Sequence, residues 1–123
     1  MTSTYHFGLL LLRVGFSAMM LTHGIPKLMN LIQGNLDFGD PIGIGSTLSL
    51  ILTVIGEAIC PILVLIGFRT RLAAIPTIIT MAVAAFVVHG ADPFGTKEKA
   101  LLYLCAFIVI ALVGAGKYSV SRK

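Results

Sequence analysis

The chain has 123 residues, of which 57% are hydrophobic and 11% are charged, and its mean hydropathy is +0.99. Soluble domains carry charge on about a quarter of their residues, and a soluble protein of this size could not bury so much apolar surface, so lipid must solvate much of the chain. The net charge of +4 comes without a nucleic-acid-binding motif; we expect it to reflect orientation in a lipid bilayer, with no nucleic acid partner.

Four apolar stretches follow one another along the chain, at about residues 7–28, 48–68, 72–88 and 98–115. Each, with its flanks, is near the roughly 20 residues that a helix needs to cross a bilayer. The first stretch lacks the basic segment and cleavage site of a signal peptide, so we expect it to be a span. We therefore predict a single all-α membrane domain over residues 1–123, a transmembrane four-helix bundle with an extracytoplasmic loop of about residues 29–47.

Basic residues near the ends of the stretches predict the orientation, because Lys and Arg gather in short cytoplasmic loops. If the N-terminus is cytoplasmic, basic residues near the span ends divide into Arg69, Arg71, Lys117, Arg122 and Lys123 inside, and Lys27, Lys97 and Lys99 outside. The hairpin GFRTR at 67–71 is short and doubly basic. We therefore predict that both termini are cytoplasmic.

The two halves of the chain share a pattern of turn residues. His23-Gly24 ends the first stretch and His89-Gly90 ends the third, and Asp-Pro pairs follow at 40–41 and 92–93. Two parallel repeats of one helical hairpin would produce this pattern, and ligand sites tend to lie at the interface of such repeats. Helical hairpins in general also use such turn residues, so both interpretations stay open.

Polar residues within the first stretch fall on one side of a helix. At about 100° per residue, one stripe collects Arg13, Ser17, Met20, Gly24 and Lys27, with His23 beside it. A charge in hydrocarbon is costly, so we predict that this stripe faces the bundle interior. Glu57 lies in the second stretch, and we predict that it pairs with Arg13, either only to lock the helices together or to take part in chemistry.

A second polar group is expected at the extracytoplasmic ends of the helices. The positions that end or begin stretches there are His23, Lys27, His89 and Glu98. We predict that they line one cavity whose floor approaches Glu57, and that this cavity suits a quinone headgroup or a small anion. Histidines bound to backbone carbonyls, and a Glu98 that only complements the helix dipole, would give the same sequence.

Metal and redox motifs are weak in this sequence. His23, His89 and Glu98 would satisfy a set of two histidines and one carboxylate, but no local histidine spacing supports a site, and we predict no metal. Cys60 and Cys105 lie in different stretches and could meet, but without a C-x-x-C pair a thiol–disulfide enzyme is not expected. The sequence has no haem, flavin or dinucleotide pattern, so an electron path would need a bound quinone or a partner.

The ordered set of polar residues resembles the DoxX family. The matching segments are LLLRVGFSAMMLTHGIPKL (10–28), Glu57, GFRTRLAA (67–74), His89, KEKALLYL (97–104) and GAGKYSV (114–120). The resemblance covers nearly the whole chain and implies a small four-helix membrane protein, here in the cytoplasmic (inner) membrane of a bacterium. The acidic residue that usually follows the YS region in the family is absent, because Val120 and Ser121 follow Ser119.

The resemblance implies a redox setting more than a defined reaction. The family's name comes from quinone-linked thiosulfate oxidation in archaea, and related proteins belong to membrane redox and oxidative-stress settings. One hypothesis is a redox accessory or quinone-linked oxidoreductase subunit that binds a quinone or a small anion. The others are a non-enzymatic transporter or assembly factor, and a structural subunit that joins a membrane partner protein or a homo-oligomer.

Overall fold

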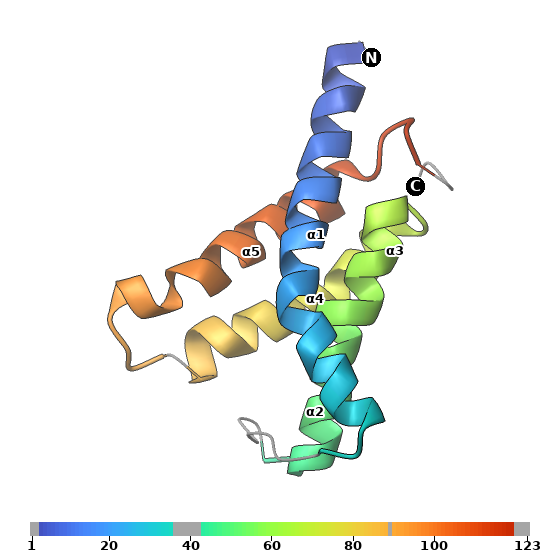
Figure 1. The fold of residues 1–123 in the computed structure, drawn as a ribbon. Coiled ribbons are helices and arrows are strands. Elements are labelled where there is room, and N and C mark those ends of the chain that lie inside the picture. Colours follow the sequence, from blue (N-terminus) through green and yellow to red (C-terminus); the bar gives the residue numbers. More distant parts are fainter. Residues whose placement is uncertain (1–2, 36–42, 89, 120–123) are drawn as a thin grey trace.

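A computed structural model describes residues 3–35, 43–88 and 90–119 of the chain. These ranges contain helices and no strand. Three helices are long and apolar enough to cross a membrane, at Ser3–Ile32, Ser46–Ile66 and Thr70–Val88. With a fourth helix they form the all-α, transmembrane four-helix bundle that the sequence predicts (Figure 1).

The first helix, α1 (Ser3–Ile32), buries one narrow stripe of its surface. Its buried residues are Leu9, Arg13, Ser17, Met20 and Gly24. They recur every three or four positions, which is the period of one helix face. Lys27, one turn further on the same stripe, is half-buried. The predicted interior stripe is therefore confirmed, and the helix ends at Ile32 rather than near residue 28.

The second span is one continuous helix with a wide π-turn in its middle, built from α2 (Ser46–Val54), η1 (Ile55–Ile59) and α3 (Cys60–Ile66). Within it the N–H of Cys60 donates to the carbonyl of Ile55, five residues back. At the same spacing of five residues, the donor for the carbonyl of Gly56 would be the N–H of residue 61. This residue is Pro61, which has no N–H, so its own helix supplies no donor to the Gly56 carbonyl at that spacing. Thr77 on the next span supplies one, since its Oγ1 donates to the Gly56 oxygen at 2.5 Å.

A tight turn joins the second span to the third. The N–H groups of Gly67 and Phe68 donate to the carbonyls of Val64 and Leu63 at 3.1 and 2.9 Å, which is the Schellman pattern that ends helices at a left-handed glycine. Gly67 has φ 78°, and a Cβ there would also meet Ser119. The third span, α4 (Thr70–Val83) with η2 (Ala84–Val88), therefore begins almost at once, and α5 (Phe94–Val113) follows it.

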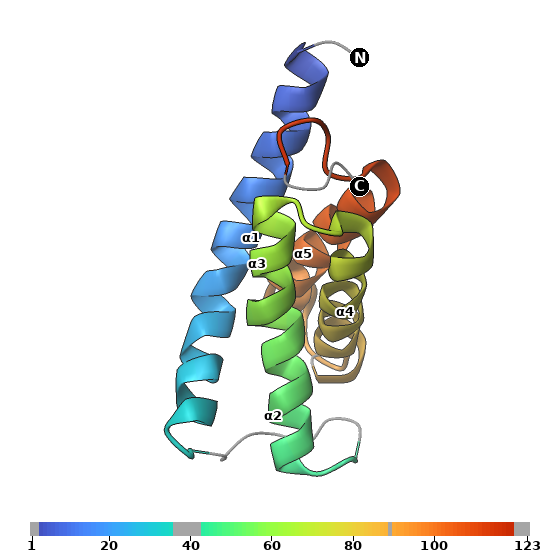
Figure 2. The same cartoon turned by 90° about the vertical axis from the view of Figure 1, so that its right-hand side faces the viewer.

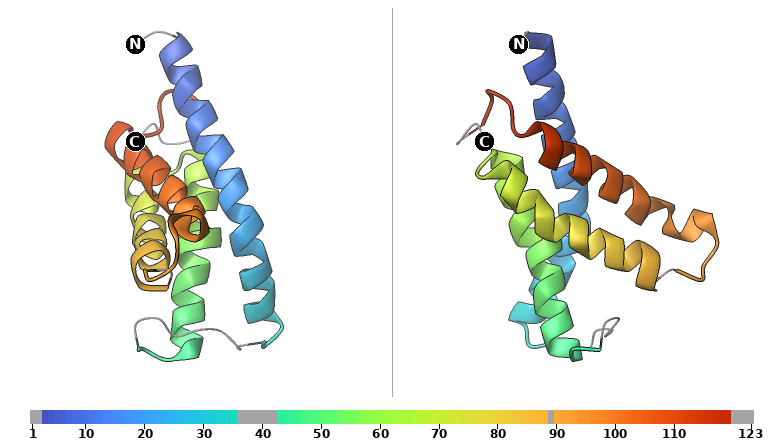
Figure 3. Two further views of the ribbon diagram at one scale, coloured as in Figure 1. Left: turned by 90° about the vertical axis from the view of Figure 1, so that its left-hand side faces the viewer. Right: turned by 180° about the vertical axis from the view of Figure 1, so that it is seen from behind.

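The helices form two hairpins that cross. The helix α1 lies beside α2–η1–α3, and α4 with η2 lies beside α5. The second hairpin covers one face of the first and crosses it obliquely (Figure 1, Figure 3). Residues 114–119 follow α5, and we term them the C-terminal segment. This segment, the start of α1 and the turn before α4 lie at one end of the molecule, which we term the terminal end (Figure 2). The start of α2 lies at the opposite end.

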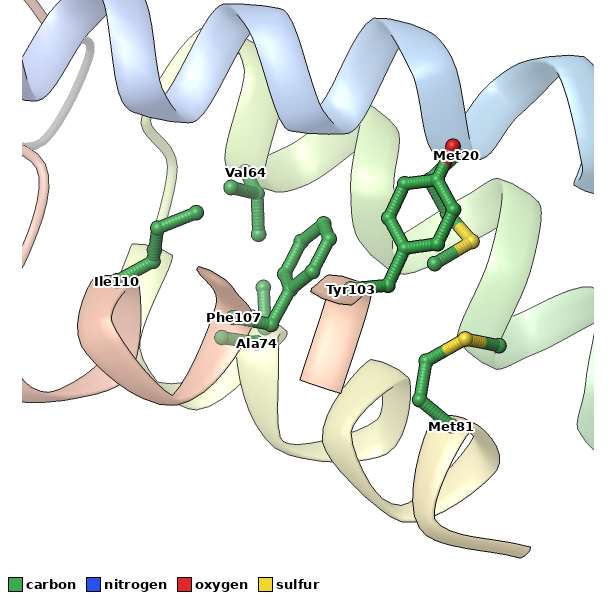
Figure 4. Packing of buried hydrophobic residues seen from close by; sticks show 8 residues of the cluster. Met20, Val64, Ala74, Met81, Tyr103, Phe107 and Ile110 are labelled. Carbon is green, nitrogen blue, oxygen red and sulfur yellow. The ribbon is translucent and has the colours of Figure 1, made fainter. Parts of the chain in front are cut away.

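The apolar core lies where the two hairpins cross. Phe107 of α5 is fully buried there, between Met20 of α1, Val64 of α3 and Ala74 of α4 (Figure 4). When helices associate within a bilayer, they exchange contacts with apolar lipid for contacts with apolar side chains, so burial of apolar surface stabilises the association little. The association therefore depends on close packing of small side chains. Ala74 has no exposed surface, and its small size lets α4 approach the Phe107 ring.

Candidate functional site

A cavity of about 160 Å³ lies between the two hairpins, beside the core. Its walls come from α1, η1, the end of α4 with η2, and α5. They consist of Met20, His23, Lys27, Glu57, Met81, Ala84, Lys99, Ala100 and Tyr103. Each π-turn contributes one lining residue, Glu57 from η1 and Ala84 from η2, and such wide turns are frequent at functional sites.

An ion pair forms the polar wall of the cavity. Lys27 Nζ donates to Glu57 Oε1 at 2.6 Å, and the side chains are 32% and 6% exposed, respectively. A buried carboxylate needs such a partner, because an isolated charge in an apolar medium is strongly disfavoured. Gly24 makes the approach of the two helices feasible, because a Cβ at that position would overlap the backbone carbonyl of Glu57.

The predicted pair of Arg13 and Glu57 is wrong. Gly24 lies level with Glu57, whereas the guanidinium carbon of Arg13 lies beside Gly67. Eleven positions separate Arg13 from Gly24, which is about 16 Å along a helix at 1.5 Å per residue. The antiparallel register of the first two spans therefore gives Glu57 to Lys27 and leaves Arg13 near the terminal end.

Arg13 instead holds backbone carbonyls together. It is 2% exposed. Its Nη1 and Nη2 donate to the carbonyls of Ala115 and Tyr118 at 2.7 Å each, and its Nε donates to the carbonyl of Leu65 at 3.3 Å. The last carbonyls of a helix have no partner within it, and the planar fork of arginine suits several acceptors at once. Arg13 thus joins the end of α3 to the C-terminal segment, away from the cavity.

His23 and Tyr103 meet across the cavity wall. Their rings are edge to face, with centroids 5.8 Å apart and planes at 79°, and Tyr103 packs in the same way on Phe16 at 6.2 Å. Such edge-to-face contacts hold aromatic rings at a defined angle. Tyr103 and Met81 approach Met20 from α5 and α4 (Figure 4). The lining of the cavity therefore combines the apolar side chains of Met20 and Met81 with the charged side chains of Lys27 and Glu57.

The structure brings together three of the residues that the sequence marked, namely His23, Lys27 and Glu57. His89 lies outside the described residues. Glu98 is exposed and does not line the cavity, which corrects its predicted place. The face that α5 turns to the cavity carries Lys99, Ala100 and Tyr103 instead, so the wall holds a cation where a carboxylate was expected.

Lys99 and Tyr103 are the polar cavity residues that sequence reasoning missed. Their spacing of four positions places them on one face of a helix, and this was the signal that could have found them.

Cys60 is buried, Cys105 is exposed, and both are free thiols. Within residues 3–35, 43–88 and 90–119, no three His, Cys, Asp or Glu side chains gather closely enough to hold a metal ion.

Comparisons with known proteins agree with this architecture. Over 116 residues the chain is 31% identical to a Bacillus subtilis (strain 168) protein named "Putative oxidoreductase CatD", covering 94% of this chain and 85% of that protein. No solved structure matches the chain significantly. The family model DoxX matches residues 8–90, which include most of α1, the ion pair and both π-turns. The chain therefore belongs to the DoxX family.

Proposed function

We propose that this protein binds a small redox-related ligand, a quinone headgroup or a small anion, in the cavity between its hairpins, and that it serves membrane oxidoreduction as an accessory protein. The observation that carries the proposal is the Lys27–Glu57 pair, which lines an open cavity inside a membrane domain. Ionisable residues within a membrane are costly to keep, and they commonly mark ligand or proton pathways. A pair needed only for packing would not have to face a cavity.

The lining can bind an oxygen-bearing ring. Lys27 and Tyr103 can donate hydrogen bonds to carbonyl oxygens, and Met20 and Met81 offer polarisable apolar surface to a ring. His23 can donate or accept a hydrogen bond through its ring nitrogens. The sequence has no haem, flavin or dithiol motif, so we assign the ligand-binding step to this chain and electron transfer to the quinone or a partner. The name of the Bacillus relative, an oxidoreductase, is consistent with that setting.

We also propose the orientation in a bacterial inner membrane, with both termini in the cytoplasm. The basic residues Arg69, Arg71 and Lys117 belong to the terminal end, in the turn before α4, the first turn of α4 and the C-terminal segment. Lys27 forms an ion pair with Glu57, so we do not count it among the loop charges on the other side of the membrane. The excess of positive charge therefore favours a cytoplasmic terminal end.

The experiment is a binding measurement on the purified protein in a neutral detergent. Decylubiquinone and benzoate serve as probes, and thermal unfolding and calorimetric titration serve as readouts. We expect at least one probe to stabilise the wild type and to lose affinity in the Lys27→Met, Glu57→Gln double variant, which removes both charges together. Lys97→Gln is the matched control, because Lys97 donates to the Gly90 carbonyl at 3.0 Å and is not among the residues that line the cavity.

Two results would contradict the proposal. One is a wild type that binds neither probe, and the other is a double variant that binds as the wild type does. Isolation of the protein with a stoichiometric partner, combined with absence of probe binding, would favour a structural subunit of a larger membrane complex.

A further inference from the structure

We infer that the preferred ligand of the cavity is a small organic monoanion with an apolar body, and that Lys99 is the residue that selects it. The inference rests on the proposed function, and it narrows the ligand class to anions. It starts from the charge balance of the lining, which the ion pair alone does not describe.

The lining of the cavity contains two lysines, Lys27 and Lys99, and one carboxylate, Glu57. Glu57 is already paired with Lys27 at 2.6 Å. Lys99 lines the same cavity and is exposed. Among the described residues its ammonium group has no hydrogen bond or ion pair. With His23 neutral, the lining carries a net charge of +1, and an anion would neutralise it.

Lys99 and Tyr103 offer donors at adjacent positions. They lie four residues apart on α5, so their side chains emerge one turn from each other. An ammonium group has donors and no acceptor, and a phenol can donate as well. Within the described part of the chain the Tyr103 hydroxyl has no hydrogen-bond partner. A single anionic oxygen would therefore receive a charge-assisted bond from Lys99 and a second bond from Tyr103.

The remaining walls set the size and character of the ligand's body. The volume of about 160 Å³ is close to the roughly 150 Å³ of an apolar cavity that takes up benzene. Met20, Met81 and Ala84 provide the apolar surface. A six-membered ring with one carboxylate or phenolate oxygen fits both features. Inorganic sulfate or phosphate would leave the methionine surface empty, and a neutral quinone would leave the charge of Lys99 uncompensated.

The test compares benzoate with benzamide, its neutral isostere, by calorimetric titration of the detergent-solubilised protein. We expect the wild type to bind benzoate about tenfold or more tightly than benzamide, since a hydrogen bond to a charged group contributes about 1.5–3 kcal/mol. In Lys99→Gln we expect benzoate affinity to fall to that of benzamide, while benzamide affinity stays unchanged. Lys97→Gln, two positions away on the same helix, should bind both probes as the wild type does.

Each of the following outcomes overturns the inference. Equal affinity of the wild type for benzoate and benzamide removes the anion preference, and unchanged benzoate binding in Lys99→Gln removes the role of that residue. If phosphatidylglycerol in mixed micelles binds in a Lys99-dependent way and benzoate does not, the lysine holds a lipid headgroup. Should decylubiquinone bind through Lys27 and Glu57 while benzoate does not, the inference fails and the proposed function stands; if neither probe binds, both fail.

Discussion

Gly24 of α1 packs directly on the backbone carbonyl of Glu57, leaving no space for a Cβ between the first two spans. This contact places Lys27, one turn further along α1, at the carboxylate of Glu57. The His-Gly sequence that ends the first predicted span thus has a packing role in its glycine and a cavity-lining role in its histidine.

Gly24→Ala should destabilise the protein by about 1–3 kcal/mol, which is typical of overpacking a tight site. The new methyl group would meet backbone atoms of Glu57 and Ala58, which cannot rotate away. Thermal unfolding in detergent measures the loss. Gly15→Ala is the control on the same helix, because a Cβ there meets nothing within 4 Å. Equal stability of the two variants would show that the close approach of α1 to Glu57 is not required.

The Lys27–Glu57 pair should show strong energetic coupling. Lys27→Met alone should cost about 3–5 kcal/mol, the range for leaving one buried charge without its partner. The double variant with Glu57→Gln should cost much less, because no charge then remains. A double-mutant cycle based on chemical unfolding in micelles checks this. Additive effects of the two single changes would mean that the ion pair contributes nothing.

Arg13 should behave as a structural residue of the terminal end. Arg13→Met should free the carbonyls of Leu65, Ala115 and Tyr118, and each such bond to a charged donor is worth about 1.5–3 kcal/mol. We expect lower stability and faster amide exchange in residues 114–119. Arg13→Lys should rescue only part of this loss, since an ammonium lacks the planar fork. Because Arg13 lies far from Glu57, the effects of Arg13→Met and Glu57→Gln on the free energy of unfolding should add. Strong coupling between them would instead support the Arg13–Glu57 pair that the sequence predicted.

The hydrogen bond from Thr77 to the Gly56 carbonyl should stabilise the protein, because Pro61 has no N–H to offer that carbonyl. Thr77→Val removes the donor to the Gly56 carbonyl, and a buried acceptor without a partner costs about 1–3 kcal/mol. Thr77→Ser should retain most of the stability. In a Pro61→Ala background the restored N–H of residue 61 can donate to the Gly56 carbonyl at the spacing of the π-turn, so the cost of Thr77→Val should shrink. If Thr77→Val lowers the free energy of unfolding equally in both backgrounds, Pro61 is not the reason that the Gly56 carbonyl needs the Thr77 hydroxyl.

The orientation can be tested by cysteine labelling in intact cells, starting from a variant in which Cys60 and Cys105 are replaced. A cysteine in place of Gln33, in the exposed turn after α1, should react with a membrane-impermeant maleimide. A cysteine in place of the exposed Lys117 should react only after the cells are lysed. The reverse pattern would place both termini outside the cytoplasm.

Much of this architecture follows from the sequence alone. The composition indicates a membrane solvent, and the helical period places Arg13, Ser17, Met20 and Gly24 on one interior stripe. The apolar runs predict four helices, of which three are long and apolar enough to cross a membrane. These inferences succeed because they depend on local properties: the hydrophobicity of a segment and the rotation of 100° per residue along a helix. The marking of His23, Lys27 and Glu57 as polar residues that must face the interior rests on the same physics.

The pairing of those residues was decided by the tertiary structure. The sequence does not state how far one helix slides along its neighbour, and the contact of Gly24 with Glu57 sets that register and gives Glu57 to Lys27 rather than to Arg13. Nor does it state how α5 is rotated about its axis, and this rotation places Lys99 in the lining of the cavity and keeps Glu98 out of it. Sliding and rotation depend on close packing between side chains distant in sequence, so no local pattern determines them.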